Sequence, residues 1–578
     1  MKKYISIIAA CMMAVSCVDT VIIPDDKTVD EDFWKNKSQV QQMVMAAYQG
    51  MLSENVIARL IVWGGLRSDE LLPIDKITGD VRDDLRDINL ANIQPDNMYA
   101  EWSSLYAVIN RCNVVLLKAR DVVGVYGGPD PSYTEGDYQA DCAEMKALRA
   151  LCYFYLLRNY RDVPMMLDAV MNSSEEYDVA QSAPSVVLDQ IIADLTEAEQ
   201  NMPSSNQYES WQQTGRLTKQ GIQALLADVY LWRAAMTHNA ADYEQVIQLA
   251  DKIFQYKKDT HQFLRGEARE EKDFYLEEGK EMFKELFIKQ NNSNESLFEL
   301  EFAGVKDVSA NMAVCKYFAH YSGTNDPYLF AASNYKYGGA TYISGGYTAD
   351  WRGSMNTYDV ETTVGDFTGF PIRKYVSNNF NFNPSSISTR ESKNRTYSTT
   401  YQQNYMIYRL TDVMLMKAEA LVALATSDDD TEHLNAAFEL VKTVNSRSRE
   451  STATELDVTT YNTIEKMEAI VLSERARELA FEGKRWYDLL RYAYRHMEGV
   501  DITKTLAQIN DEGGNFAVTY DAMLKFVEDK LSGKGAAVTA KMKTEPSLYM
   551  PVPQRDIYLA PSLRQNPAYS LNEIYSKN

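Results

Sequence analysis

The sequence has few of the residues that staple a fold or hold a metal. Its 578 residues include only six cysteines and five histidines. Cys11 and Cys17 lie near the N-terminus, which leaves for the body Cys112, Cys142, Cys152 and Cys315. So few cysteines in so long a chain indicate that an apolar core, rather than disulfides, holds the fold together. No Cys or His spacing matches a metal site, and we expect neither a metal nor another cofactor.

Positive charges are outnumbered by negative ones. The chain carries 59 Lys and Arg against 81 Asp and Glu, a formal net charge of −22. A field of this sign repels a phosphate backbone and an anionic lipid surface. We therefore expect no nucleic acid partner and no membrane binding through a basic patch.

Long apolar runs are absent beyond the first residues. The segment "MKKYISIIAACMMAVSC" (1–17) has two lysines followed by an apolar run from Ile5 to Val15. That run is too short to span a bilayer, and the order of charge, apolar run and small residue is typical of an export signal. No other stretch is long and apolar enough to cross a membrane.

The small residues before Cys17 are similar to a bacterial lipobox. We predict a signal peptide over 1–16, a lipidated Cys17 and a tether over 17–30. Cys11 is the alternative, since "IAAC" fits a strict lipobox better than "AVSC", but cleavage there leaves a shorter apolar run. The lipid would be the only attachment to the membrane.

What the sequence does contain is helical periodicity. Apolar residues recur at spacings of three and four from Phe33 to Met51. The pattern predicts further helices over about 101–121, 139–160, 188–202, 219–237, 241–256, 404–425, 432–448 and 463–496. Short connections join two pairs of these helices, 219–237 with 241–256 and 404–425 with 432–448. They suggest tetratricopeptide-like pairs, although no strict repeat of about 34 residues is visible. We predict a mainly α fold.

Between about 260 and 400 the helical period fades. Gly, Asn, Ser, Thr and Tyr accumulate, as in "SNYKYGGATYISGGYTADWRGSMNTYD" (333–359). A loop region of this length inside a compact chain is usually functional or disordered, and its aromatic residues argue against disorder.

The stretch "RARELAFEGKRWYDLLRY" (475–492) has the carboxylates that an active site needs. Taken as one helix, it aligns Glu474, Glu478 and Glu482 at i, i+4 spacing. Arginines lie at helical spacing from every carboxylate, and we predict the i, i+3 pairs Glu482–Arg485, Arg485–Asp488 and Asp488–Arg491. Such pairing keeps carboxylates ionised and passive, so we expect a partly buried ion-pair seam and no catalytic residue. A glycine inside a helix costs about 1 kcal/mol, so Gly483 predicts close packing by another segment.

This stretch resembles the C-terminal signature of the SusD/RagB family of Bacteroidetes outer-membrane lipoproteins. Further segments resemble the family in order: 33–51, 66–71 ("LRSDEL"), 102–115, 143–166, 215–232, 294–302, 408–422 with 444–449, and 548–570. Two positions depart from the family pattern: Arg161 stands where the family often has Gly, and Ala14 loosens the lipobox.

The resemblance implies an α-superhelix of four tetratricopeptide-like pairs that supports a loop-rich half. It implies a body over 31–578, with helical pairs over about 31–256 and 404–496 and a ligand-binding insertion over about 260–400. It also implies a lipid-anchored protein on the outer surface of a Gram-negative outer membrane. Such proteins cover a SusC-like TonB-dependent transporter and capture nutrient, usually an oligosaccharide, without catalysing a reaction.

Aromatic residues of the insertion are the ligand candidates. A flat ring covers the C–H face of a sugar, and neighbouring polar groups meet its hydroxyls. We predict ligand contacts by Tyr328, Tyr335, Tyr337, Tyr347 and Trp351, with Asn334, Asp350 and Arg352 as polar partners.

Other interpretations stay open at this point. A peptide-capturing, RagB-like lipoprotein would have the same architecture, a glycoside hydrolase would need two free carboxylates, and a pure helical scaffold would not need the aromatic loops. A calcium ion held by Asp80, Asp83 and Asp84 is conceivable, but the segment lacks EF-hand spacing and a solvated loop is favoured.

Overall fold

A computed structural model of the chain describes residues 33–74, 79–172, 178–265, 276–277, 279, 282–287, 293–302, 310–319, 327–332, 350–357, 362–364, 367–376, 403–449, 454–531 and 533–569. Within them the protein is mainly helical, as predicted. No helix in this part of the chain combines the length and apolar character that crossing a membrane requires.

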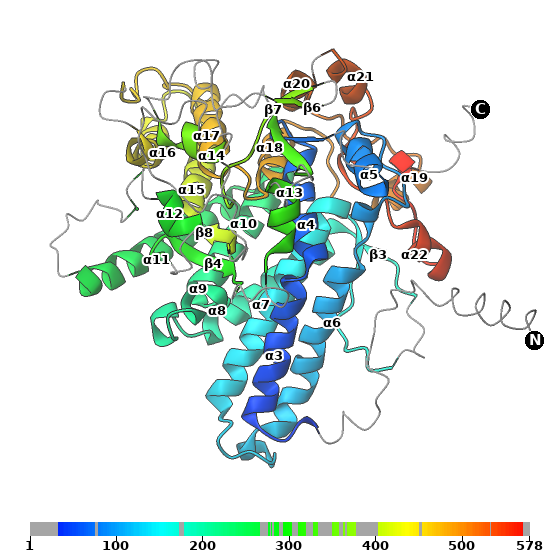
Figure 1. The fold of residues 1–578 in the computed structure, drawn as a ribbon, viewed down its shortest axis with the longest axis vertical. Helices are drawn as coiled ribbons and strands as arrows, with labels where there is room; N and C mark the ends of the chain where they lie inside the picture. The colour runs from blue at the N-terminus through cyan, green and yellow to red at the C-terminus, as the bar shows by residue number, and fades with distance from the viewer. Residues whose placement is uncertain are drawn as a thin grey trace, which may run out of the picture.

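The N-terminal helices pack along one another. Their bounds are α3 (Lys37–Met51), α4 (Glu54–Ile61), the π-helix η1 (Val62–Leu66), α5 (Asp80–Asn89), α6 (Ser103–Lys118) and α7 (Glu135–Tyr160). Figure 1 shows α3, α6 and α7 side by side, reaching away from the rest of the molecule. The apolar face of α3 explains this packing, because Val40, Val44, Ala47 and Met51 are fully buried against the neighbouring helices.

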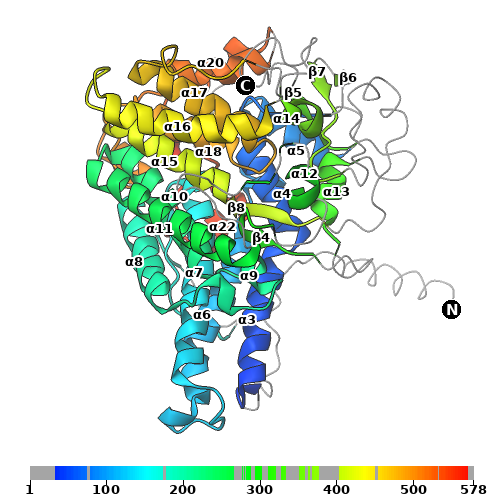
Figure 2. The same ribbon diagram turned by 90° about the vertical axis from the view of Figure 1, so that its left-hand side faces the viewer.

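Helical hairpins follow along the chain. They are built from α8 (Pro184–Asn201), α9 (Gln212–Gly215), α10 (Lys219–Thr237), α11 (Ala240–Arg265), α15 (Leu410–Leu424), α16 (Thr431–Ser448), α17 (Ile464–Glu478) and α18 (Arg485–Arg495). The predicted pairs are confirmed, since α10 packs on α11 and α15 on α16. Figure 2 shows α8, α11, α15 and α16 stacked along one side of the molecule.

One predicted helix begins as a strand. The segment predicted over 404–425 contains β8 (Tyr405–Arg409) before α15 begins at Leu410. All five residues of β8 are buried, and the strand pairs antiparallel with β4 (Ser296–Leu300). Aromatic and β-branched residues buried on both faces suit a strand, and tertiary pairing therefore outweighs the helical spacing here.

The region between 260 and 400 contains short regular elements. These are α12 (Met282–Phe287), α13 (Met312–Phe318), α14 (Trp351–Asn356) and an antiparallel sheet in the order β1 (Leu71–Pro73), β5 (Leu329–Ala332), β7 (Phe367–Phe370), β6 (Thr362–Val364). In the sheet register, Leu72 is paired with Phe330 and Ala331 with Phe370. Figure 2 places these elements on the side opposite the stacked hairpins, which we call the insertion side.

Shorter elements complete the body. The C-terminal helices are α19 (Leu506–Asp511), α20 (Asp521–Lys530), α21 (Gly535–Thr539) and α22 (Gln554–Leu559), and a two-stranded ladder joins β2 (Val163–Pro164) to β3 (Gln181–Ser182). Single 3₁₀ turns occur at Met98–Ala100, Ala119–Val122, Gly124–Tyr126, Ser205–Gln207, Glu545–Leu548 and Pro567–Tyr569.

Candidate ligand-binding site

The signature stretch forms two helices rather than the predicted single one. α17 ends at Glu478 and α18 begins at Arg485, with a turn between them. Phe481 and Gly483 in this turn have φ of 63° and 68°, which a right-handed helix cannot accommodate. The close packing expected at Gly483 is confirmed: a β-carbon on Gly64 would lie 2.0 Å from the Gly483 carbonyl oxygen.

The three glutamates of the signature are buried and paired with cations, which confirms the ion-pair seam. Most of these cations come from distant segments. Glu474 pairs with Arg352 and Arg477. Glu478 pairs with Arg352, Arg409 and Arg447, and Glu482 pairs with Lys374 and Arg409. We call these residues, with Glu295 and Asp350, the ionic core. It joins the signature to the insertion and to β8.

The pairs predicted inside the signature form only in part. Arg491 Nη2 donates to Asp488 at 2.7 Å, as predicted. Arg485 instead donates through Nε and Nη2 to Asp69, at 2.7 and 2.8 Å. The predicted pairs of Arg485 with Glu482 and Asp488 are therefore wrong, because the turn removes the helical register before Arg485 and tertiary partners compete after it.

The electrostatics of the ionic core do not suit acid–base catalysis. Burial alone would raise the pKa of the Glu478 carboxyl, but the guanidinium groups of Arg447, Arg409 and Arg352 hold this pKa well below its usual range. Burial would also raise the pKa of the Glu474 carboxyl, but Arg352 and Arg477 lower this pKa below its usual value. Both carboxylates are thus ionised and hold their partners in place.

The "LRSDEL" segment (66–71) contacts the signature directly, which the sequence pattern did not reveal. Asp69 accepts the two hydrogen bonds from Arg485, and Glu70 Oε1 accepts one from the Phe481 N–H at 2.8 Å. Burial raises the pKa of Glu70 to about 8. Arg67 lies 4.7 Å above the Trp486 ring. Two of the motifs that carry the family resemblance therefore form one buried junction.

Two of the predicted ligand residues point into this core. Arg352 donates to Asp350 through Nε at 2.9 Å and through Nη2 at 2.6 Å. Its Nη1 donates to Glu474 and Glu478, at 2.7 and 2.9 Å. Asp350 also caps α14, accepting a bond from the Arg352 backbone N–H. Both side chains are buried, with their charges satisfied inside the protein.

Trp351 lies between these two anchored residues and is only partly buried. It packs at the edge of the core, where a β-carbon on Gly279 would approach its Cδ1 to 3.1 Å. Tyr328 is also partly buried, and its ring meets Tyr317 edge-on at 5.2 Å. The structure does not bring the rings of Tyr328 and Trp351 into contact. Outside the described residues lie the other predicted positions: Asn334, Tyr335, Tyr337, Tyr347 and the lipidation site Cys17.

The acidic segment considered for calcium makes other contacts. Asp83 pairs with Arg82 at 2.8 Å, and Asp84 accepts a bond from the Met98 backbone N–H at 2.9 Å. Across the described residues, no three His, Cys, Asp or Glu side chains are grouped as a metal ion would need.

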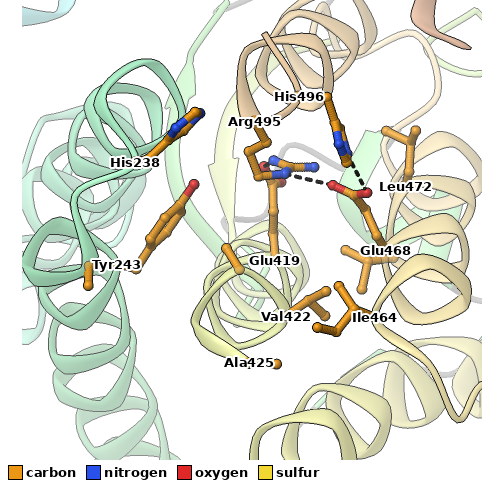
Figure 3. A pocket seen from close by; sticks show the side chains of 13 residues that line it. His238, Tyr243, Glu419, Val422, Ala425, Ile464, Glu468, Leu472, Arg495 and His496 are labelled. Atoms are coloured by element: carbon orange, nitrogen blue, oxygen red, sulfur yellow. Dashed lines mark hydrogen bonds and ion pairs between the residues drawn. The ribbon is translucent and has the colours of Figure 1, made fainter. Parts of the chain in front are cut away.

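A pocket of about 250 Å³ opens among the helical hairpins (Figure 3). It lies where the turn between α10 and α11 meets α15, α17 and α18. Among the residues that line it are Tyr243, Glu419, Val422, Ile464, Glu468, Leu472 and Arg495. Nothing in the sequence indicated this pocket, because its lining residues belong to four separate helices and are spaced as ordinary core and surface positions.

Comparison with known proteins decides the family. The model of the "SusD family" matches residues 250–569, which is more than half of the chain. The chain belongs to the SusD family. A second model, described as "Starch-binding associating with outer membrane", matches residues 24–231.

Relatives match along most of the chain. SusD-like protein P38 of Formosa agariphila is 25% identical over 495 residues, covering 81% of this chain and 86% of that protein. A SusD-like protein of Bacteroides ovatus is 24% identical and covers 83% of this chain and 82% of its own length.

Solved structures share the fold. A SusD superfamily protein from Bacteroides vulgatus has a TM-score of 0.66 at 16% identity, covering 93% of this chain and 100% of that one. A laminarin-binding SusD-like protein has a TM-score of 0.58 at 20% identity, with coverage of 93% and 100%. The SusD family consists of glycan-binding proteins that associate with the outer membrane and are not enzymes. The chain is thus a binding protein, in agreement with the passive carboxylates of its signature.

Proposed function

We propose that this protein is a cell-surface lipoprotein, anchored through Cys17, that captures an oligosaccharide or polysaccharide. It delivers the glycan to a SusC-like TonB-dependent transporter for import across the outer membrane. Membership of a glycan-binding, outer-membrane-associated family supports the proposal. The laminarin-binding neighbour has the same fold, which makes a glycan the favoured class of ligand.

The observation that carries the ligand site is the anchoring of Trp351. Asp350 and Arg352 on either side of it are fixed in the ionic core. The backbone of this partly buried indole is therefore held in place before a ligand arrives, which lowers the entropy cost of binding. The ring offers the flat apolar face that a sugar requires. We assign Asp350 and Arg352 to positioning Trp351, and Trp351 and Tyr328 to ligand contact together with Asn334, Tyr335, Tyr337 and Tyr347.

The test is a binding screen with a matched tryptophan control. The mature protein is assayed against plant, host and microbial polysaccharides and peptides by affinity electrophoresis and calorimetry. We expect one glycan to bind, and Trp351→Ala to weaken it about tenfold, equivalent to ~1.4 kcal/mol. Trp211→Ala removes a 44% exposed indole at the start of α9, outside the region between 260 and 400, and should leave the affinity unchanged. Binding of peptides alone would favour the peptide-capturing alternative, and released product would refute a binding-only role.

The lipid anchor has its own test. Replacing Cys17 by Ser should move the protein from the membrane fraction to the soluble fraction, because no acyl chain can then be attached. Cys11→Ser should stay with the membrane. The reverse result would assign the lipid to Cys11. The transporter partner is tested by purifying the wild-type protein from detergent-solubilised membranes and looking for a TonB-dependent transporter that copurifies with it. If no such transporter copurifies at saturating glycan, delivery to it is contradicted.

A further inference from the structure

The pocket among the hairpins is a second candidate site, separate from Trp351. None of its lining residues comes from the region between 260 and 400. Part of its lining is aliphatic, formed by Val422 and Ala423 of α15 and by Ile464 and Leu472 of α17. Glu419 and Glu468 of the same two helices also line it, together with Tyr243 and Arg495, so the pocket offers both apolar and polar contacts to a ligand.

Arg495 is one of the polar residues that line the pocket. Its Nε donates to Glu468 at 2.8 Å, and its Nη1 donates to Glu419. Its Nη2 has no acceptor among the described residues, which leaves two N–H donors for a ligand. Glu419 is further bound by Arg491 through two hydrogen bonds of 2.9 Å. Burial alone would raise the pKa of Glu419, but Arg491 and Arg495 hold it far below its usual range, so it is ionised.

Tyr243 supplies an unused polar group. The residue is only 4% exposed, and its hydroxyl points into the pocket (Figure 3). No described residue forms a hydrogen bond with this hydroxyl. The hydroxyl is open to the pocket, where a ligand or solvent can form a hydrogen bond with it. Tyr243 can both donate and accept, which matches an alcohol.

The charges around the pocket select against ionic ligands. Glu419 and Glu468 offset Arg491 and Arg495, so these groups carry no net charge when His496, whose Nε2 lies 2.8 Å from Glu468, is neutral. An anion would approach two carboxylates and a cation two guanidinium groups. A neutral ligand avoids both repulsions.

The volume of the pocket limits the size of the ligand that it can hold. Pockets for drug-sized ligands measure roughly 300–1,000 Å³, and this one is about 250 Å³. A single sugar unit is a neutral molecule of about this size that carries both hydroxyls and C–H groups. We propose that this pocket binds one neutral monosaccharide, with Tyr243 and Arg495 on its hydroxyls and the aliphatic side chains on its C–H groups. The choice of a sugar rests on the proposed glycan-binding function. The preference for a small neutral ligand comes from the lining of the pocket and is independent of that function.

The test uses free monosaccharides and paired variants. Glucose, galactose, mannose, xylose, arabinose and N-acetylglucosamine are screened by saturation-transfer NMR, and any binder is titrated. We expect one of them to bind, Tyr243→Phe to weaken it about fivefold, and Ala423→Leu to abolish it by filling the pocket. Ala241→Leu adds the same side chain at an exposed position of α11 outside the pocket and should behave as wild type. Far-UV circular dichroism checks the fold of each variant, and Tyr243→Phe decides the matter if Ala423→Leu does not fold.

The outcomes separate this proposal from the proposed function. No monosaccharide binding, or binding that Tyr243→Phe and Ala423→Leu leave unchanged, overturns the pocket proposal. If polysaccharide capture sensitive to Trp351→Ala persists in that case, the proposed function stands by itself. Monosaccharide binding lost in the pocket variants, without any polysaccharide capture, supports the pocket and refutes capture on the insertion side. Binding of a peptide in the pocket in place of every sugar also overturns the proposal.

Discussion

At the residue scale, the contact between Gly483 and the N-terminal helices is the tightest constraint in the signature. A β-carbon on Gly483 would lie 2.6 Å from the Tyr405 hydroxyl and 2.7 Å from the Leu60 carbonyl oxygen. The sequence predicted close packing at this position, since a glycine in a helix needs a reason. It could not predict the positive φ, because the turn depends on contacts with residues more than 400 positions away.

Replacing Gly483 by Ala should therefore destabilise the protein strongly. The left-handed conformation costs a β-carbon about 1–2 kcal/mol, and the clash with backbone and a buried ring adds about 1–3 kcal/mol. Gly499→Ala is the control, because Gly499 has φ of 75° and a β-carbon added there would have no other atom within 4 Å. The Gly499→Ala variant should lose only the free energy of unfolding that corresponds to the left-handed backbone conformation. Urea unfolding compares the two, and equal losses would show that the packing at Gly483 is looser than the structure indicates.

The partners of the signature illustrate what spacing alone misses. Charges three or four apart predicted Asp488–Arg491, which is local. The partners of Glu474, Glu478 and Glu482 come mostly from other segments, and nothing in a helical pattern points to them. The same limit applies to the candidate ligand residues: spacing singled out a polar and aromatic segment around Trp351, while only the fold shows that Asp350 and Arg352 pair with one another.

At the element scale, the sequence predicted the long helices well. The predicted 219–237 and 432–448 agree with α10 and α16 to within one residue, because apolar spacing and polar ends coincide there. The predictions fail at 404–425 and 463–496, where a strand and a turn interrupt an apolar pattern that continues through them. The helix predicted over 241–256 also ends too early, since α11 continues to Arg265. The short elements of the insertion side have no periodicity of their own, and packing against the hairpin body fixes them.

Helix α7 offers a test of an element boundary. Its N-cap Thr134 accepts a hydrogen bond from the Asp137 N–H, and the Asp137 carboxylate accepts one from the Thr134 N–H. Thr134→Ala breaks this capping box and should cost about 1 kcal/mol. Thr134→Ser keeps the hydroxyl oxygen that caps the helix and should lower the free energy of unfolding by only about a few tenths of a kcal/mol. Thermal unfolding followed by circular dichroism measures both, and indistinguishable variants would mean that packing alone fixes the start of α7.

At the scale of the whole molecule, the ionic core joins segments that are far apart in the chain. Glu478 alone holds Arg352 of the insertion, Arg409 of β8 and Arg447 of α16. Removing one member of a buried network leaves its partner charges unpaired, which typically costs about 3–5 kcal/mol. The hairpins and the insertion side should therefore unfold together rather than as independent parts.

This core predicts a cooperative acid transition. The folded-state pKa values of Glu474 and Glu478 lie below the ordinary 4.5. Outside the ionic core, the pKa of the buried Asp412 also falls, to about 2, because Lys484 and Arg475 outweigh its burial. A depressed pKa contributes stability that is fully present above the unfolded-state value and is lost as pH falls through the folded-state value. Urea midpoints should therefore fall steeply as the pH drops below 4.5, with near- and far-UV circular dichroism changing together.

Salt separates the buried pairs from exposed ones such as Lys543–Asp521, whose side chains are 51% and 82% exposed. Screening weakens exposed pairs strongly and buried pairs little. The acid transition should therefore keep its midpoint pH between about 0.1 and 1 M NaCl, where the Debye length falls from about 10 to 3 Å. A midpoint that moves with salt would assign acid unfolding to surface charge repulsion from the net charge of −22. Two separate transitions would show that the ionic core does not couple the hairpins to the insertion side.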